Sequence, residues 1–199
     1  MRTRSHVLQR LENMTKSHQR PKKMKCTSKF LTLVLRHKPE IADVSLDPQG
    51  WVQIDLLIRG VRKTGRDLKR SELDEIVSSC PKKRLTISDD GRRIRAAQGH
   101  SIQVDLGLDP QVPPDTLFHG TARQSLDSIF QEGLKSGGRT LVHLSHDEET
   151  ATAVGRRHGK PVVLTVQSGE MHRDGLTFFR ADNGVWLTQS VPSKYLGFS

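Results

Sequence analysis

The chain has 199 residues, enough for one medium-sized domain or two small ones, and its formal net charge is +10. Its two cysteines, Cys26 and Cys80, exclude a disulfide-rich scaffold and favour a reducing, cytoplasmic setting. No apolar run approaches the ~20 residues of a membrane-spanning helix, so we expect no membrane partner.

The positive charge lies in the front half of the chain. Residues 1–26 contain eight Lys or Arg and one acid, which makes them a basic N-terminal extension of charge +7. Residues 27–108 contribute +4 and residues 109–199 contribute −1. A basic front half favours a polyanionic partner such as nucleic acid, although a solubilising extension has the same composition.

The front half predicts short helices followed by a β-ribbon. A helix capped by Thr27 or Ser28 is expected to end before Pro39, because the residue before a proline avoids helical geometry. The turn Asp47–Gly50 predicts a short hairpin. The strands of that hairpin are residues 44–46 and 51–54; helices follow over 55–62 and from about Ser71, and strands over 85–87 and 93–95 flank Asp89–Gly91. This order of elements resembles a winged helix, a common nucleic-acid module.

A proline-containing segment, residues 109–114, predicts a linker and a domain boundary. The elements expected beyond it are strands over 116–118, 141–144, 161–166, 176–179 and 185–187, with helices over 123–132 and 147–158. We therefore expect an α+β protein with domains over residues 27–108 and 115–199, the second dominated by strands.

Six short clusters combine arginine, histidine and small residues, without cysteine or carboxylate. They are Leu35-Arg36-His37, Lys82-Lys83-Arg84, Gln98-Gly99-His100-Ser101, Phe118-His119-Gly120-Thr121, Arg139 with Val142-His143-Leu144-Ser145, and Asn183-Gly184-Val185-Trp186-Leu187-Thr188. Guanidinium groups grip phosphate oxygens, and imidazole moves a proton beside them. The clusters together predict a site that handles phosphate.

Each cluster taken alone also has a structural explanation. Arg36 and His37 suit the C-terminus of a helix electrostatically. The segment His119–Thr121 falls between a predicted strand and a predicted helix, where a glycine allows close approach of a nucleotide. Neither the Rossmann fingerprint nor the P-loop is present. His143 and Ser145 share one face of a strand, which is equally typical of a core. No histidine pair has the usual zinc-motif spacing, so we expect no metal.

In their order along the chain, these motifs resemble those of the NAD-dependent RNA 2′-phosphotransferases, known in tRNA splicing. The resemblance covers about residues 29–195 and includes Gln49-Gly50-Trp51 and Arg93-Ile94-Arg95-Ala96. It implies an N-terminal winged-helix-like RNA-binding lobe joined to a C-terminal, strand-rich, ADP-ribosyltransferase-like lobe that binds NAD+. The active site would lie between the two lobes.

The resemblance also implies the reaction. An internal 2′-phosphate of RNA, of the tRNA splice-junction type, attacks the nicotinamide ribose of NAD+ and releases nicotinamide. The ribose 2″-hydroxyl then attacks the phosphorus of the ADP-ribosylated RNA. The products are RNA with a 2′-hydroxyl and ADP-ribose 1″,2″-cyclic phosphate.

The site residues follow from the same resemblance. The family's catalytic set corresponds to Arg36, His37, Arg84 and Arg139. The three arginines would grip the phosphate, and His37 would position it or protonate the leaving 2′-oxygen. Contacts to NAD+ are implied for His119, Gly120, Thr121, His143, Leu144 and Ser145. Contacts to the RNA substrate are implied for Gln98, Gly99, His100 and Ser101.

We expect a monomer that consumes NAD+ as co-substrate and acts on RNA carrying a 2′-phosphate, with tRNA as the natural substrate. Two alternatives stay open. One is an ADP-ribosyltransferase that caps terminal nucleic-acid phosphates or modifies protein. The other is a non-catalytic winged-helix nucleic-acid binder, which predicts salt-sensitive RNA binding without release of nicotinamide.

Overall fold

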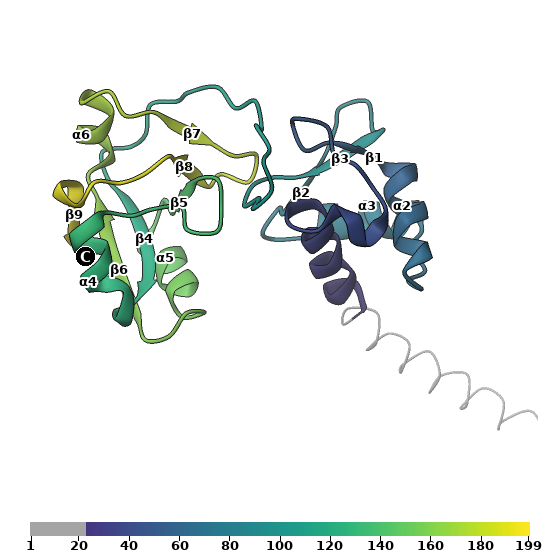
Figure 1. Ribbon diagram of the computed structural model, residues 1–199, viewed down its shortest axis with the longest axis horizontal. Helices are drawn as coiled ribbons and strands as arrows, with labels where there is room; N and C mark the ends of the chain where they lie inside the picture. The colour runs from purple at the N-terminus through teal and green to yellow at the C-terminus, as the bar shows by residue number, and fades with distance from the viewer. Residues whose placement is uncertain (1–22) are drawn as a thin grey trace, which may run out of the picture.

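A helix opens the part of the chain that the computed structural model describes, residues 23–199 (Figure 1). This helix covers residues 23–36, and Leu31, Val34 and Leu35 on one face are buried, as the apolar spacing predicts. Its predicted end before Pro39 is confirmed, since Pro39 begins the short 3₁₀ helix η1 (Pro39–Ala42).

The N-cap predicted at Thr27 or Ser28 is wrong. The chain is already helical at residue 23, and Thr27 Oγ1 donates a hydrogen bond of 3.1 Å to the Lys23 carbonyl one turn earlier. Hydroxyl side chains form this bond inside helices as readily as they cap them, so the residue type alone does not mark a helix start. Of the basic extension, residues 1–22 lie outside the described residues.

The first lobe continues with two helices and a small antiparallel sheet. Its elements are β1 (Val52–Gln53), α2 (Ile54–Lys63), α3 (Arg70–Ser79), β2 (Leu85–Ile87) and β3 (Arg93–Ala96), with the strands in the order β1-β3-β2. The predicted helices and the β2–β3 ribbon are confirmed. The hairpin predicted between residues 44–46 and 51–54 is wrong, because 44–46 form no strand and β1 pairs with β3 instead. The Asp47 carboxylate closes this turn by accepting the backbone N–H groups of Gln49 and Trp51 at 2.9 and 2.8 Å.

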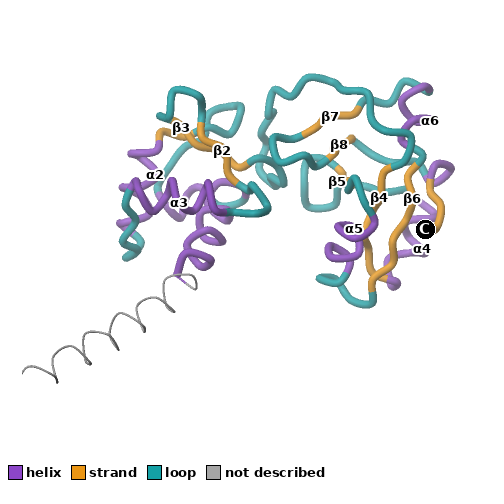
Figure 2. The backbone as a smooth tube through the Cα atoms, turned by 180° about the vertical axis from the view of Figure 1, so that it is seen from behind, coloured by secondary structure: helices purple, strands orange, loops and turns teal. Residues whose placement is uncertain are grey.

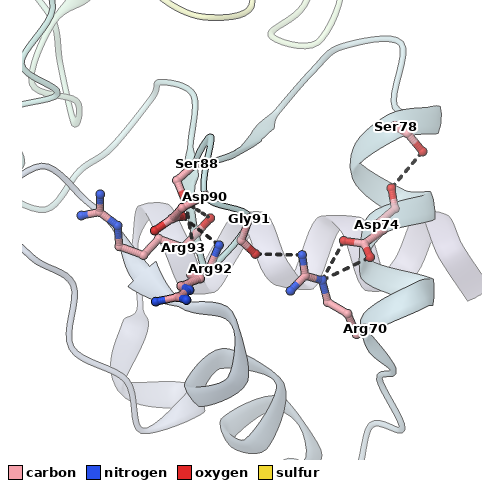
Figure 3. Close-up of polar contacts among 8 residues, drawn as sticks. All are labelled: Arg70, Asp74, Ser78, Ser88, Asp90, Gly91, Arg92 and Arg93. Atoms are coloured by element: carbon pink, nitrogen blue, oxygen red, sulfur yellow. Dashed lines mark hydrogen bonds and ion pairs between the residues drawn. The ribbon is translucent and has the colours of Figure 1, made fainter.

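The turn of the β2–β3 ribbon is fastened to α3 (Figure 3). Arg70 donates through Nη2 to the Gly91 carbonyl and through Nε to Asp74 Oδ1, both at 2.9 Å. Within the turn, Asp90 Oδ1 accepts the backbone N–H of Arg92 at 2.9 Å. These bonds hold the ribbon against α3 and so fix the point from which the chain leaves β3.

The second lobe contains two three-stranded antiparallel sheets, in the orders β4-β6-β9 and β5-β8-β7 (Figure 2). Its elements are β4 (Leu117–Ala122), η2 (Arg123–Ser125), α4 (Leu126–Glu132), β5 (Val142–Leu144), α5 (Glu148–Gly155), β6 (Pro161–Val166), α6 (Ser168–Arg173), β7 (Phe178–Arg180), β8 (Trp186–Thr188), η3 (Ser193–Tyr195) and β9 (Leu196–Phe198). A bridge between Phe118 and Ser145 joins the two sheets. The apolar patterns predict most of these elements but miss α6 and β9.

Each lobe has its own hydrophobic core. Buried side chains from Leu31 to Ala96 form one cluster, and those from Leu117 to Tyr195 form the other. Residues 109–114 contain no helix or strand, and the backbone N–H of Gln111 donates to the Phe178 carbonyl at 2.8 Å. The chain is therefore an α+β protein with small antiparallel sheets, in which two bodies lie side by side and are joined by the segment after β3 (Figure 1). Among residues 23–199, no helix is long and apolar enough to cross a membrane.

Candidate active site

Three arginines from separate parts of the fold lie close enough to affect one another's ionisation. Arg36 is the last residue of the helix over 23–36, Arg84 directly precedes β2, and Arg139 lies between α4 and β5. Burial, and then the positive charges of Arg139 and Arg84, lower the pKa of Arg36 to about 10. In the part of the chain that the structure describes, none of the three pairs with an Asp or Glu side chain. Their charge is therefore available to a bound anion.

A five-residue stretch after β3, residues 97–101, connects the three arginines through the backbone, and we call it the junction segment. The Ala97 N–H donates to the Arg84 carbonyl at 2.9 Å, and the Ser101 N–H donates to the Arg36 carbonyl at 3.0 Å. The carbonyl of His100 accepts the backbone N–H of the residue after Arg139, at 3.2 Å. The junction segment thus sets the spacing of all three arginine backbones.

Gly99, in the junction segment, lies directly against the Arg36 side chain. Its φ is +87°, and a Cβ atom there would come within 3.3 Å of Arg36 Nη1. Both the left-handed backbone and the close approach require glycine at this position. Gln98 beside it is half-buried. These two residues therefore surround the arginines, whether or not they also touch a substrate.

His37 and His100 lie next to the arginines on the side of the first lobe. His37 Nδ1 and Ser101 Oγ are 2.8 Å apart, and burial together with the charges of Arg36 and Arg139 lowers the pKa of His37. His100 is 2% exposed, and its Nε2 has no hydrogen-bond partner among the described residues. Burial and the charge of Arg36 lower the pKa of His100 to about 4. Both rings are therefore mainly neutral at pH 7 in the free protein.

Two further histidines face the same charge from the second lobe. His119 Nδ1 lies 3.1 Å from the carbonyl oxygen of His143, across the contact between the two sheets. Burial lowers the pKa of His119, and burial followed by the charge of Arg139 lowers the pKa of His143 to about 3. His143 Nε2 is buried and, within residues 23–199, lacks a hydrogen-bond partner. An unpaired buried nitrogen beside a cationic cluster is an available contact for a ligand.

The expected strand-to-helix turn at His119–Thr121 is wrong, because all three residues lie inside β4. A Cβ on Gly120 would lie 1.7 Å from the Ala151 carbonyl oxygen, so the glycine lets α5 pack directly on β4. Thr121 is 8% exposed, and Leu144 belongs to the core of the second lobe. Gly120, Thr121 and Leu144 therefore shape the wall behind the site, while His119, His143 and Ser145 lie where the two sheets meet.

Sequence reasoning missed Cys80 and Arg157. Arg84 Nη1 lies 3.8 Å from Cys80 Sγ. Burial raises the pKa of the Cys80 thiol, but the N–H groups of Arg84 and Lys82 outweigh it, and the pKa is lowered overall. The charge of Arg157, just after α5, lowers the pKa of Lys82 and contributes to the lowered pKa of Arg139. The run Arg156-Arg157-His158 was the available signal for this additional cation.

Comparison with known proteins places the chain in a family. The family model described as "RNA 2′-phosphotransferase, Tpt1 / KptA family" matches residues 22–190. A probable RNA 2′-phosphotransferase of Agrobacterium fabrum is 55% identical over 173 residues, which cover 87% of this chain and 93% of that protein. The RNA 2′-phosphotransferase of Escherichia coli strain K12 is 51% identical over 176 residues, covering 88% and 96%. The chain therefore belongs to the RNA 2′-phosphotransferase family and is a transferase.

Proposed function

We propose that the protein removes an internal 2′-phosphate from RNA by transferring it to NAD+, through an ADP-ribosylated RNA phosphate. The observation that carries this proposal is the set of Arg36, Arg84 and Arg139, whose charges act on one another with no carboxylate paired to them in residues 23–199. A phosphomonoester is largely a dianion at neutral pH, since its second pKa is about 6. Such a dianion supplies the negative charge that this cluster lacks.

The chemistry needs the cluster more than it needs a general base. The phosphate dianion is already a nucleophile, so the first step requires orientation and charge neutralisation. Nicotinamide leaves as a neutral group, and the first step therefore requires no strong acid either. The arginine forks fix the angle at which the phosphate approaches the ribose, and they stabilise the charge that builds on phosphorus in the second step.

His37 is placed to supply the proton that the second step requires. The neighbouring arginines lower the pKa of His37 in the free protein. A bound phosphate dianion reverses the sign of the local charge, raises that pKa and favours the imidazolium. Ser101 Oγ, 2.8 Å from Nδ1, leaves Nε2 as the nitrogen that faces substrate and protonates the departing 2′-oxygen.

NAD+ would bind along the second lobe. The unpaired Nε2 of His143 and the ring of His119 offer hydrogen bonds beside Arg139, and Ser145 adds a hydroxyl. Gly120, Thr121 and Leu144 would contribute through the backbone or through packing. Gln98, Gly99, His100 and Ser101 would contact the ribose or the phosphate from the junction segment. This donor set fits a dinucleotide's hydroxyl and phosphate groups.

The same proposal extends to the lobes and the setting. Residues 27–108, in which helices precede a β-ribbon, would be a winged-helix-like RNA-binding lobe. Residues 115–199, with two antiparallel sheets, would be an ADP-ribosyltransferase-like lobe, and residues 109–114 the linker between them. We infer a cytoplasmic monomer that acts on tRNA splice junctions.

A product assay tests the proposal. The protein is incubated with NAD+ and an RNA carrying one internal 2′-phosphate, and a matched RNA with only a terminal phosphate serves as the control. We expect nicotinamide, RNA with a 2′-hydroxyl and ADP-ribose 1″,2″-cyclic phosphate from the first RNA alone. A stable ADP-ribosylated product, or reaction with the terminal phosphate, would instead support a capping ADP-ribosyltransferase. Binding without nicotinamide release would support a non-catalytic binder.

A further inference from the structure

A buried arginine outside the phosphate cluster connects the two lobes. Arg95 lies on β3 and is 8% exposed. Its Nη2 is 3.3 Å from Asp182 Oδ2 in the second lobe, and its Nη1 donates to the Leu106 carbonyl at 2.8 Å. The guanidinium carbon also lies 4.5 Å from the centre of the Trp51 ring. One side chain thus contacts β3's neighbour in the first lobe, the connecting segment and the second lobe.

Asp182 is rigidly attached to the strands that carry the second lobe's site residues. It lies in a tight turn, in which the Ala181 N–H donates to the Val185 carbonyl at 2.9 Å. The turn leads directly into β8, which pairs with β5 so that Leu187 lies opposite His143. A displacement of Asp182 therefore moves β8 and β5 together, and with them the segment that bears Arg139.

The other end of the contact is attached to the junction segment. Arg95 is followed by Ala96, the end of β3, and then by residues 97–101. On that side, the junction segment carries the backbones of Arg36 and Arg84. Across the cleft, its printed backbone link to the second lobe is the bond from Thr140 to His100. A single bond of 3.2 Å leaves the lobe angle loosely fixed unless a second contact braces it.

We propose that Arg95 and Asp182 form an inter-lobe strut that positions Arg139 against Arg36 and Arg84. Neither residue touches the phosphate in this role; both act by setting the width of the cleft. The inference rests on the proposed function, because it assumes that the phosphate on one lobe reacts with NAD+ on the other. Displacements near 1 Å at a reacting centre reduce rates by about a hundredfold, so a loosened strut has a measurable effect.

Asp182→Asn tests the strut, since it removes the charge while keeping the shape of the side chain. We expect kcat to fall about tenfold or more, because the lobes align less often, while the KM for NAD+ stays within about twofold, because the second lobe alone holds the dinucleotide. Hydrogen exchange of the Thr140 amide should accelerate in the same variant, since its bond to His100 crosses between the lobes. Asp182→Glu, which restores the carboxylate, should recover most of kcat and of the Thr140 protection.

Asp43→Asn is the matched control, because it removes an ion pair of 2.8 Å to Lys63 that lies within the first lobe. It should leave kcat and the Thr140 amide unchanged. A wild-type kcat and wild-type exchange in Asp182→Asn, or an equal loss in the control, would overturn the strut. If Asp182→Asn fails to fold, Asp182→Glu decides: loss of kcat and of Thr140 protection in that folded variant also overturns it. The exchange measurement needs no substrate, so it separates failure of the strut from failure of the proposed function.

Discussion

Arg36 is the residue at which the electrostatics of the site converge. It has a pKa of about 10 because it is buried and lies near two other arginines, an arrangement that is unfavourable without an anion. Gly99 and the Ser101 N–H hold its side chain and backbone in place. The protein therefore maintains an uncompensated positive charge that a phosphate dianion relieves on binding.

Replacement of Arg36 or His37 by alanine should slow the second step more than the first. Arg36 stabilises charge on phosphorus and His37 supplies a proton to the leaving oxygen, and both roles belong to phosphate transfer. We expect the ADP-ribosylated RNA to accumulate, with transfer reduced by about a hundredfold, as is typical when one oxyanion donor is removed. A rapid-quench time course measures both steps. Arg92→Ala, on the exposed ribbon turn, should behave as wild type; equal loss of both steps in Arg36→Ala would contradict the assignment.

The buried histidines should make the fold sensitive to acid. His100 has a pKa of about 4 in the folded protein, mainly because it is buried, and about 6.5 when unfolded. Below pH 6.5 the unfolded chain binds a proton that the folded chain does not, so stability is complete above pH 6.5 and decreases as the pH falls towards 4. The decrease from this group is about 2 kcal/mol at pH 5. Urea unfolding at pH 7 and pH 5 measures it, and His100→Gln should reduce the difference. An unchanged difference in that variant would refute this explanation.

At the scale of elements, the contact between β4 and α5 forms the wall of the second lobe. Gly120 on the strand meets the Ala151 carbonyl, and Gly155 on the helix meets Thr121 in turn. Two glycines at facing positions bring the helix backbone onto the strand, which in turn carries His119. The glycine in this motif therefore serves packing directly and the site indirectly.

Gly120→Ala should destabilise the protein by about 3 kcal/mol or more. A Cβ 1.7 Å from a backbone oxygen is accommodated only if α5 moves away from β4, and such overpacking is costly. Thermal or urea unfolding measures the change. Gly138→Ala is the control, since nothing lies within 4 Å of its Cβ position, and its effect should stay within about 0.5 kcal/mol. Equal stability of the two variants would show that α5 does not pack as described.

At the scale of the whole molecule, the net charge of +10 and the cations around the cleft favour a polyanion. Lys82 contributes from the first lobe and Arg157 from the second, and each lies near a member of the arginine cluster. RNA binding by such a surface depends on the release of counterions.

Binding of a 2′-phosphorylated RNA strand should therefore weaken steeply with salt. With three or four phosphate contacts, the logarithm of the binding constant should fall with the logarithm of salt concentration at a slope of about −2 to −3. Fluorescence anisotropy without NAD+ measures it. Lys82→Ala should make the slope shallower by about 0.7, the contribution of one contact to a single strand. A slope near zero in the unmodified protein would contradict RNA binding at this face.

The sequence determined the local elements and the kind of chemistry. Helices such as α2 and the β2–β3 ribbon follow from apolar periodicity and turn residues, which act between near neighbours. The order of the arginine and histidine motifs indicated the family, which the comparisons show. Where a residue type serves two local roles equally well, as Thr27 does in a cap or inside a helix, the pattern failed.

Only the tertiary structure decided how those residues meet. The junction segment joins Arg36, Arg84 and the Arg139 region through backbone bonds between distant parts of the chain, and no local pattern encodes such bonds. The contact of Arg95 with Asp182 and the close approach of Gly120 to α5 likewise arise from the packing of whole elements. The physical reason is one of range: periodicity and turn chemistry act over a few residues, whereas the spacing of the arginines depends on how two separate cores are set against each other.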